Sequence, residues 1–485
     1  MRCSSAALNV DIGRVDSESA DDAVSCGVFV IPGIAALVMF LLARPQEFLP
    51  ILTRVPLLYI LCAAALGGFA LDLKLRRSQP VAAPALRWVL IYMVWAAICT
   101  LIKASPTFIA RLIDLGIIFV VFYILGHAIQ RLRALQVVAG ALMATALFLT
   151  FVCFHQGFAD RQCIALNPGD PEQGIADGRD CDTKKQCETG GADPSLEYRC
   201  EKAGLFGTWA IEDRVRYRGE LHDPNELSLT ICVFGFSFLI AFMLRNKSPS
   251  FKLFGWLAGI MLIWTIFMTQ SRGGLVVMML VPGTYMVRKY GVKAIIWGAL
   301  VALPVLSLGG RSGESADEST MQRYEAWAAG LDMWRESPIF GVGMRRFSDH
   351  HYLTAHNSFV LSLAELGFPG LCLFVALMYI SGKVLIVGLR ELNGVPGTET
   401  ARVWGMSLFA SLLGLNFQIG TISFAYHSVT WILLGFIAAW GTTVRNHRPQ
   451  FNVKLTGRDL TIIVVACGLY AAIVLPIFLK IKGAM

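Results

Sequence analysis

The chain has 485 residues, of which 55% are hydrophobic and only 16% are charged, and its formal net charge is +8. A soluble protein has about a quarter of its residues charged, so this composition excludes a soluble enzyme and indicates a polytopic membrane protein. The positive charge does not indicate a nucleic-acid partner, because no helix-turn-helix, zinc-finger or aromatic RNA-binding motif accompanies it.

The first 23 residues are polar and mildly acidic. They lack the basic start and the cleavage pattern of a secretory signal, so we expect the first apolar run to remain as a membrane span. Residues 1–23 should then form a cytoplasmic tail.

Thirteen apolar stretches are long enough, or nearly so, to cross a bilayer at about 20 residues each. They lie at residues 24–43, 55–71, 86–102, 109–128, 134–154, 225–244, 251–269, 273–287, 292–308, 357–382, 401–421, 426–444 and 460–480. Two of them are short, so we predict an all-α polytopic membrane protein with 12 or 13 transmembrane helices. Helices 1–5 should occupy residues 24–154, helices 6–9 residues 225–308, and helices 10–13 residues 357–485.

The basic loops predict the orientation. Lysine and arginine clusters follow the second, fourth, sixth, eighth and twelfth stretches, for example Arg76 and Arg77 after the second and Arg288 and Lys289 after the eighth. If the spans alternate, all these clusters lie on one side, which the positive-inside rule makes cytoplasmic. Two long loops, residues 155–224 and 309–356, then face the periplasm.

The first long loop contains four cysteines, at positions 163, 181, 187 and 200. Four cysteines in an exported loop suggest two disulfides, in any of three pairings. A zinc site is the weaker alternative, because the paired CxxC spacing is missing. A calcium site in the acidic run 177–182 is disfavoured too, because its ligands have no ordered spacing. We therefore expect a solvated, disulfide-stapled loop.

The second long loop has helical periodicity. Apolar residues recur every three or four positions at Met321, Tyr324, Trp327, Leu331 and Trp334. This stripe predicts an amphipathic helix, either lying on the membrane interface or simply packed on the spans. Pro338 should end this helix, and the glycines that follow should form a turn.

Polar elements at the outer ends of three predicted spans could carry chemistry. They are Arg216-Tyr217-Arg218-Gly219 with Asp223-Pro224-Asn225, then Ser271-Arg272-Gly273-Gly274, and finally His356-Asn357. Arginine suits a phosphate, because its planar fork donates two parallel hydrogen bonds and keeps its charge. Arginine is also a common interfacial anchor, so Arg272 alone fits either role.

His356 is a candidate base, because an ordinary histidine titrates near pH 6.5. A histidine at the membrane edge is otherwise often a satisfied polar residue, and His350 and His351 lie close enough in sequence to compete for the role. Glu365 is the acidic residue of the same predicted span, where an ionisable group is costly. Nine residues place it opposite His356 on a helix, so we expect a structural bond from Glu365 to another helix. The glycines 367 and 370 should allow close helix packing.

Motifs for nucleotide or metal-held nucleotide-sugar chemistry are missing, since the chain has no P-loop and no metal-ligand cluster. We expect neither a metal nor another cofactor.

Together, the three polar elements resemble the O-antigen ligase superfamily, which also contains O-antigen and exopolysaccharide polymerases. The family's ligase motif is His, then Asn, Ser or Gln, nine residues and Gly-x-x-Gly, and His356, Asn357, Gly367 and Gly370 match it. The family's Arg-x-x-Gly and Pro-Asn pair, and its Ser-Arg-Gly element, are matched at Arg216, Gly219, Pro224, Asn225, Ser271, Arg272 and Gly273. The resemblance covers roughly residues 200–440.

The resemblance implies a metal-independent glycosyltransferase of the bacterial inner membrane. Its donor would be a glycan on undecaprenyl diphosphate, and its acceptor lipid A-core or another glycan, at the periplasmic face. His356 would activate the acceptor hydroxyl, and Arg216 and Arg272 would hold the diphosphate. Arg218, which has no counterpart in the family motif, would assist Arg216. Asn225, Asn357 and Glu365 would support the site.

The chain departs from the family in two ways, a thirteenth predicted span and a longer cysteine-bearing loop. The motifs also do not separate a ligase from a polymerase that joins lipid-linked repeat units. A transporter of the same lipid is the alternative from another class. It predicts polar residues at midmembrane and an inverted repeat, neither of which the sequence shows.

Overall fold

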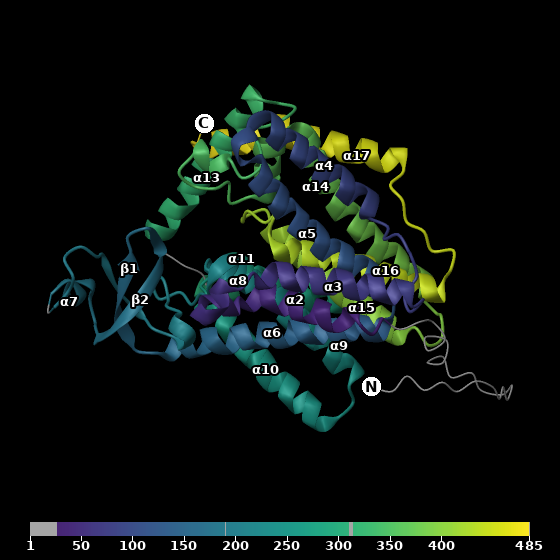
Figure 1. Ribbon diagram of the computed structural model, residues 1–485, viewed down its shortest axis with the longest axis horizontal. Helices are drawn as coiled ribbons and strands as arrows, with labels where there is room; N and C mark the ends of the chain where they lie inside the picture. Colours follow the sequence, from purple (N-terminus) through teal and green to yellow (C-terminus); the bar gives the residue numbers. More distant parts are fainter. Residues whose placement is uncertain (1–26, 190, 310–313, 485) are drawn as a thin grey trace.

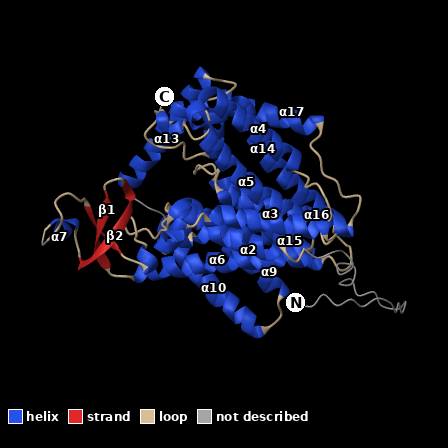
Figure 2. Cartoon of the chain, viewed as in Figure 1, coloured by secondary structure: helices blue, strands red, loops and turns tan. Residues whose placement is uncertain are grey.

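The computed structural model describes residues 27–189, 191–309 and 314–484, so the predicted cytoplasmic tail, 1–23, lies outside the described residues. A helical bundle forms most of the molecule, and one small sheet lies at its end (Figures 1 and 2). The helices are α2 Val30–Ala43, α3 Leu57–Lys74, α4 Leu86–Lys103, α5 Phe108–Ala128, α6 Leu132–Phe158, α7 Lys184–Glu188, α8 Pro224–Thr230, α9 Ser237–Arg245, α10 Pro249–Met268, α11 Arg272–Tyr290, α12 Lys293–Gly309, α13 Glu314–Glu336, α14 Ser358–Glu391, α15 Glu399–Gln418, α16 Ser428–His447, α17 Gly457–Leu469 and α18 Leu475–Ile481.

The helices confirm an all-α polytopic membrane protein, because every predicted stretch coincides with a helix in the part of the chain that the structure describes. Eight helical segments there are long and apolar enough to cross a membrane: α3, α4, α5 with the turn before it, α6, α8 to α9, α10, α14 and α17 to α18. The helices α2, α11, α12, α15 and α16 are shorter or less apolar, so the count of 12 or 13 spans stays a prediction. Burial explains why α16 is less apolar than the other spans: its residues from Ser428 to Val444 are all buried inside the bundle and pack against other helices.

Residues 161–202 form a sheet that the sequence did not predict. Three antiparallel strands, β1 Arg161–Asn167, β2 Asp170–Asp180 and β3 Tyr198–Lys202, lie in the order β2-β1-β3. The predicted loop is therefore folded, and α6 continues to Phe158 before it begins.

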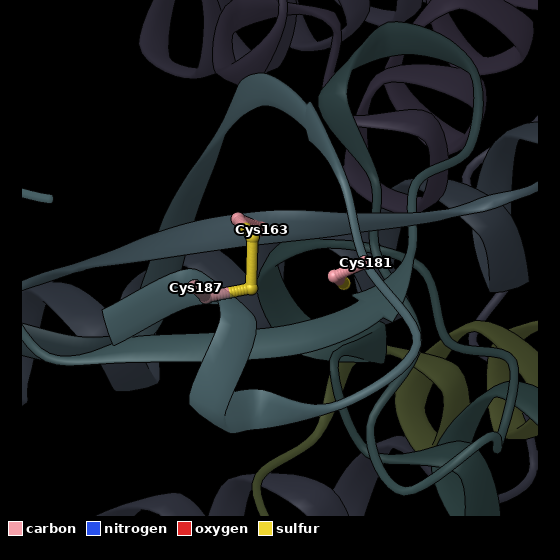
Figure 3. Close-up of side chains that lie close together, drawn as sticks. All are labelled: Cys163, Cys181 and Cys187. Atoms are coloured by element: carbon pink, nitrogen blue, oxygen red, sulfur yellow. A yellow bond between two sulfur atoms is a disulfide. The ribbon is translucent and has the colours of Figure 1, made fainter. Parts of the chain in front are cut away.

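Two disulfides hold this sheet together. Cys163 is bonded to Cys187 and Cys181 to Cys200. Figure 3 shows the first bridge, with Cys181 beside it. The alternative of a zinc site is excluded for these residues, because both bridges consume the thiols that a metal would need.

The amphipathic helix in the second long loop is confirmed as α13. Its rings Tyr324 and Trp327 pack edge-on and tilted against Phe478 of α18, and Leu331 is fully buried. The stripe of α13 thus packs on the bundle, as the second of the two readings expected.

Helix α14 is broken near its N-terminal end. Gly367 has φ +68°, a conformation that glycine adopts without strain, and the helical path changes direction there. A Cβ at this position would collide with the backbone carbonyl of Ile339. The close packing expected at Gly367 is therefore against the loop after α13, rather than against another helix.

Candidate active site

The turn that follows the sheet fixes Arg216. Its backbone nitrogen donates to the side-chain oxygen of Gln156 over 2.9 Å, and the side-chain nitrogen of Gln156 donates to the Arg216 carbonyl over 3.2 Å. The guanidinium lies 3.8 Å from the ring centroid of Trp209, and its Nε donates to the Trp209 carbonyl over 3.2 Å. Arg216 is only 4% exposed, so its cation is buried and held in one orientation.

Arg218 is anchored to two other segments. Its Nη1 donates to the Glu47 carbonyl over 2.7 Å, and its Nη2 donates to the carbonyl of Gly207. Burial lowers the pKa of Arg218, but an arginine still keeps its charge. The two arginines of the Arg216–Gly219 element are therefore placed by backbone groups of neighbouring loops.

Asn225 links two of the three polar elements. Its side-chain oxygen accepts a 2.7 Å hydrogen bond from the Ser271 hydroxyl, which in turn accepts from the Gly274 nitrogen over 3.0 Å. Ser271 is the N-cap of α11, because a hydroxyl there satisfies a backbone N–H that the helix leaves unpaired. The Gln418 side chain donates to the Asn225 carbonyl over 2.7 Å.

The third element joins the other two through the end of α15. The Ser358 nitrogen donates to the Ile419 carbonyl over 2.8 Å, one residue after Gln418. Asn357 is the N-cap of α14, and its side-chain oxygen accepts from the nitrogens of Phe359 and Val360. Asn225 and Ser358 thus bond to consecutive residues, Gln418 and Ile419, and this ties the third element to the other two.

His356 lies just before this cap, with a left-handed φ of +44°. Its pKa is lowered, first by burial and then by the positive charge of Arg323 on α13, while Asp223 acts in the opposite sense. Asp223 caps α8 and accepts from both the backbone and side-chain nitrogens of Asn225. His356 is therefore near the first element as well. In its competitor His351, the ring Nδ1 accepts a 3.1 Å hydrogen bond from the Leu353 nitrogen.

Arg272 is the first residue of α11, and its side chain is exposed. The glycine after it is needed for space, since a Cβ at Gly273 would approach the Gln418 side chain to 3.3 Å. We call His356, Asp223, Asn225, Ser271 and Arg272 the rim cluster.

Glu365 lies outside the rim cluster. Its carboxylate accepts from the backbone nitrogens of Arg345 over 2.9 Å and Phe347 over 3.1 Å. The expected bond to another helix is therefore a pair of bonds to the loop after α13. This loop and the outer part of α14 are also joined by backbone bonds from Val342 and Gly343.

A cavity of about 1170 Å³ lies beside the rim cluster, and we call it the polar chamber. Arg216, Arg218 and Glu365 line it. His356, Arg272, Asn225 and Asn357 are not among the described residues that line it. The predicted site residues thus fall into two groups, which share the Arg216–Asn225 segment.

The chamber contains charged residues that sequence reasoning missed. Arg44 and Arg345 line it, and so do Glu220 and His427. Glu220 binds the Ser428 hydroxyl over 2.6 Å and Arg44 over 2.9 Å, and its pKa is lowered by His427 and Arg44 against the effect of burial. The signal that could have found Arg44 is its place in an outward loop, the same signal that singled out Arg272.

His427 is held through both ring nitrogens. Its Nδ1 accepts from the Val429 nitrogen over 3.2 Å, and its Nε2 lies 3.0 Å from the Glu220 carbonyl, to which it donates. The ring stacks on Phe424 at 3.8 Å, and burial lowers the pKa of His427. Both nitrogens are occupied, so His427 positions the Glu220 turn rather than offering a base.

Comparison with known proteins agrees with the resemblance. The family model described as O-antigen ligase matches residues 256–375, which contain Arg272 and His356. No curated protein matches the chain. The match supports the O-antigen ligase superfamily and, in general terms, a multi-pass membrane glycosyltransferase of the ligase or polymerase type.

Proposed function

We propose that the protein transfers a glycan from undecaprenyl diphosphate to an acceptor hydroxyl, on lipid A-core or another glycan, at the periplasmic face of the bacterial inner membrane. The observation that carries the proposal is the set of hydrogen bonds that links Asn225 to Ser271 and ties both Asn225 and Ser358 to the end of α15. Polar motifs separated widely in sequence are thereby tied to one end of α15, and we expect a membrane-bound substrate to reach them there.

His356 takes the proton of the acceptor hydroxyl in this reaction. The acceptor oxygen then bonds to the anomeric carbon, and the bond from that carbon to the diphosphate breaks. Burial and Arg323 favour the neutral imidazole that a base requires. Nearby Asp223 stabilises the imidazolium once the proton has been transferred.

Arginines stabilise the negative charge that develops on the leaving diphosphate. Arg272 is exposed beside two glycines, so a headgroup can approach it closely. Arg216 and Arg218 are fixed before the substrate binds. They need no reorientation during the reaction, and this makes their electrostatic stabilisation effective. These cations supply the charge that a metal supplies in other transferases, so the reaction needs no metal.

The orientation rests on two supports. The disulfide-bonded sheet suits an oxidising compartment, and the basic loops suit the cytoplasm. The sheet lies at one end of the bundle, beyond the end of α6 (Figure 1). The site should face the same side as the sheet, since Arg216 binds Gln156 near the end of that helix.

The length of carrier-linked glycan in cells that have only the His356→Ala variant tests the proposal. Full-length polymer that accumulates on the carrier identifies a ligase, and single repeat units identify a polymerase. His350→Ala is the matched control, because His350 is an exposed neighbour. A His356→Ala profile identical to that of the parent would remove His356 from the reaction and favour a transporter.

A further inference from the structure

The polar chamber lies between the stapled sheet and the loops at the helix ends. β1 and β2 contribute Ala165, Leu166 and Ile175 to its lining, and the bundle side contributes the arginines and acids described above. The sheet therefore forms one wall of a cavity whose other walls include Arg216, Arg218 and Glu365.

The chamber lining contains both cationic hydrogen-bond donors and anionic hydrogen-bond acceptors. Arg44, Arg216, Arg218 and Arg345 only donate, whereas Glu47, Glu220 and Glu365 only accept. A diphosphate only accepts, so the carboxylates would repel it. A sugar hydroxyl donates and accepts at once, so a lining of both kinds fits a ligand rich in hydroxyls.

One buried polar atom in the lining points to a ligand. The side-chain oxygen of Gln46 is buried and makes no hydrogen bond to any described residue. Buried polar atoms are nearly always paired, so this oxygen indicates a partner that binds in the chamber.

The charged surroundings exclude a lipid tail. The volume of about 1170 Å³ admits a ligand larger than a drug-sized molecule, for which about 300–1,000 Å³ is typical. An isoprenoid chain would meet charged groups in this cavity and leave them unsolvated, which costs free energy. The 78% exposed Ile175 on β2, one of the apolar residues of the lining, offers a surface for the carbon face of a sugar ring.

We propose that the polar chamber binds the saccharide chain of a glycan substrate, and that the disulfide-stapled sheet is the wall that selects it. The inference rests on the proposed function, because it says where the glycan of that reaction lies. The rim cluster handles the proton and, together with Arg216 and Arg218, the diphosphate, and the rest of the chamber lining recognises the sugars.

The test is saccharide binding to the full-length protein in lipid nanodiscs, measured by titration calorimetry. The probe is the glycan that mild acid releases from the lipid-linked pool of the host cell, which has neither lipid nor diphosphate. Ile175→Trp fills the chamber from its outer wall. Ala176→Trp is the matched control, because successive residues of a strand point to opposite faces and Ala176 does not line the chamber.

We expect Ile175→Trp to weaken binding at least about tenfold, which corresponds to about 1.4 kcal/mol, and Ala176→Trp to leave the Kd within about twofold. Gln46→Leu keeps the bulk but removes the amide, and should weaken binding about fivefold. No saccharide binding by the parent, or equal binding by the two tryptophan variants, would overturn the inference.

His356→Ala separates the two proposals. This variant should bind the free saccharide as the parent does and lose transfer. If it retains transfer, the proposed function fails while the chamber stands. If transfer is lost but Ile175→Trp binds normally, the chamber inference fails while the proposed function stands.

Discussion

The hydroxyl of Ser271 donates its hydrogen bond to the side chain of Asn225, 46 residues earlier in the chain. This single bond fixes the start of α11, and therefore Arg272, relative to the turn that holds Asp223. Ser271→Ala removes this bond and the cap of α11 together. We expect it to lower the free energy of unfolding by about 1–2 kcal/mol and to slow transfer about tenfold.

Ser248→Ala is the control for this substitution, because Ser248 occupies the N-cap position of α10 without a side-chain capping bond. Thermal unfolding in detergent and a transfer assay compare the two variants. Equal unfolding temperatures would contradict the role of the Ser271 bond.

Arg272→Lys should preserve folding and reduce transfer. Lysine keeps the charge but loses the planar fork that grips two phosphate oxygens, so we expect a loss of about a hundredfold in rate. The rate is measured with purified protein and a lipid-linked donor. Arg335→Lys, an exposed arginine of α13, should be as active as the parent. Similar rates for both variants would argue against a phosphate at Arg272.

The rate of transfer should depend on the pKa of His356. A base works in its neutral form, and a pKa below the ordinary 6.5 places the acidic limb of the rate profile below pH 6.5. Arg323→Gln removes a positive neighbour, so the pKa should rise and the acidic limb should move to higher pH. A profile that does not move would show that the limb belongs to another group.

Gly367→Ala should destabilise the protein. Alanine is strained at φ +68° by about 1–3 kcal/mol, and its Cβ would also meet the carbonyl of Ile339. Gly382→Ala in the same helix is the control, because its Cβ would meet only Leu412, at 3.8 Å. Unfolding temperatures in detergent distinguish them, and a harmless Gly367→Ala would mean that α14 is not broken there.

Peptide mapping of the oxidised protein should recover the pairs Cys163–Cys187 and Cys181–Cys200. Replacing Cys181 and Cys200 by serine should lower the stability of the sheet by about 2–4 kcal/mol. Either of the other two pairings, found in non-reducing digests, would refute the arrangement of strands.

Helices could be predicted from the sequence because a span must be apolar over about 20 residues, and such runs are visible without tertiary information. The sheet could not. β2 contains aspartates, glycines and a proline with no apolar alternation, and it is a strand because β1 and the disulfides hold it. Strand formation there is decided by partners distant in sequence.

The rim cluster could be predicted from the sequence, because its motifs all lie at the ends of predicted spans that face the same side of the membrane. The polar chamber was not. Arg44 and Arg345 are single arginines in loops, a pattern that interfacial anchors share. Only their convergence around one cavity distinguishes them, and convergence requires the fold.

The two disulfides interlock along the chain, since Cys181 lies between Cys163 and Cys187 while its partner Cys200 lies beyond both. A protease that cuts once anywhere from residue 163 to residue 200 therefore leaves the two halves of the protein covalently joined. An exposed segment is the usual place for such a nick. The wall of the chamber can thus be cleaved without being shed, and only a reductant would separate the pieces.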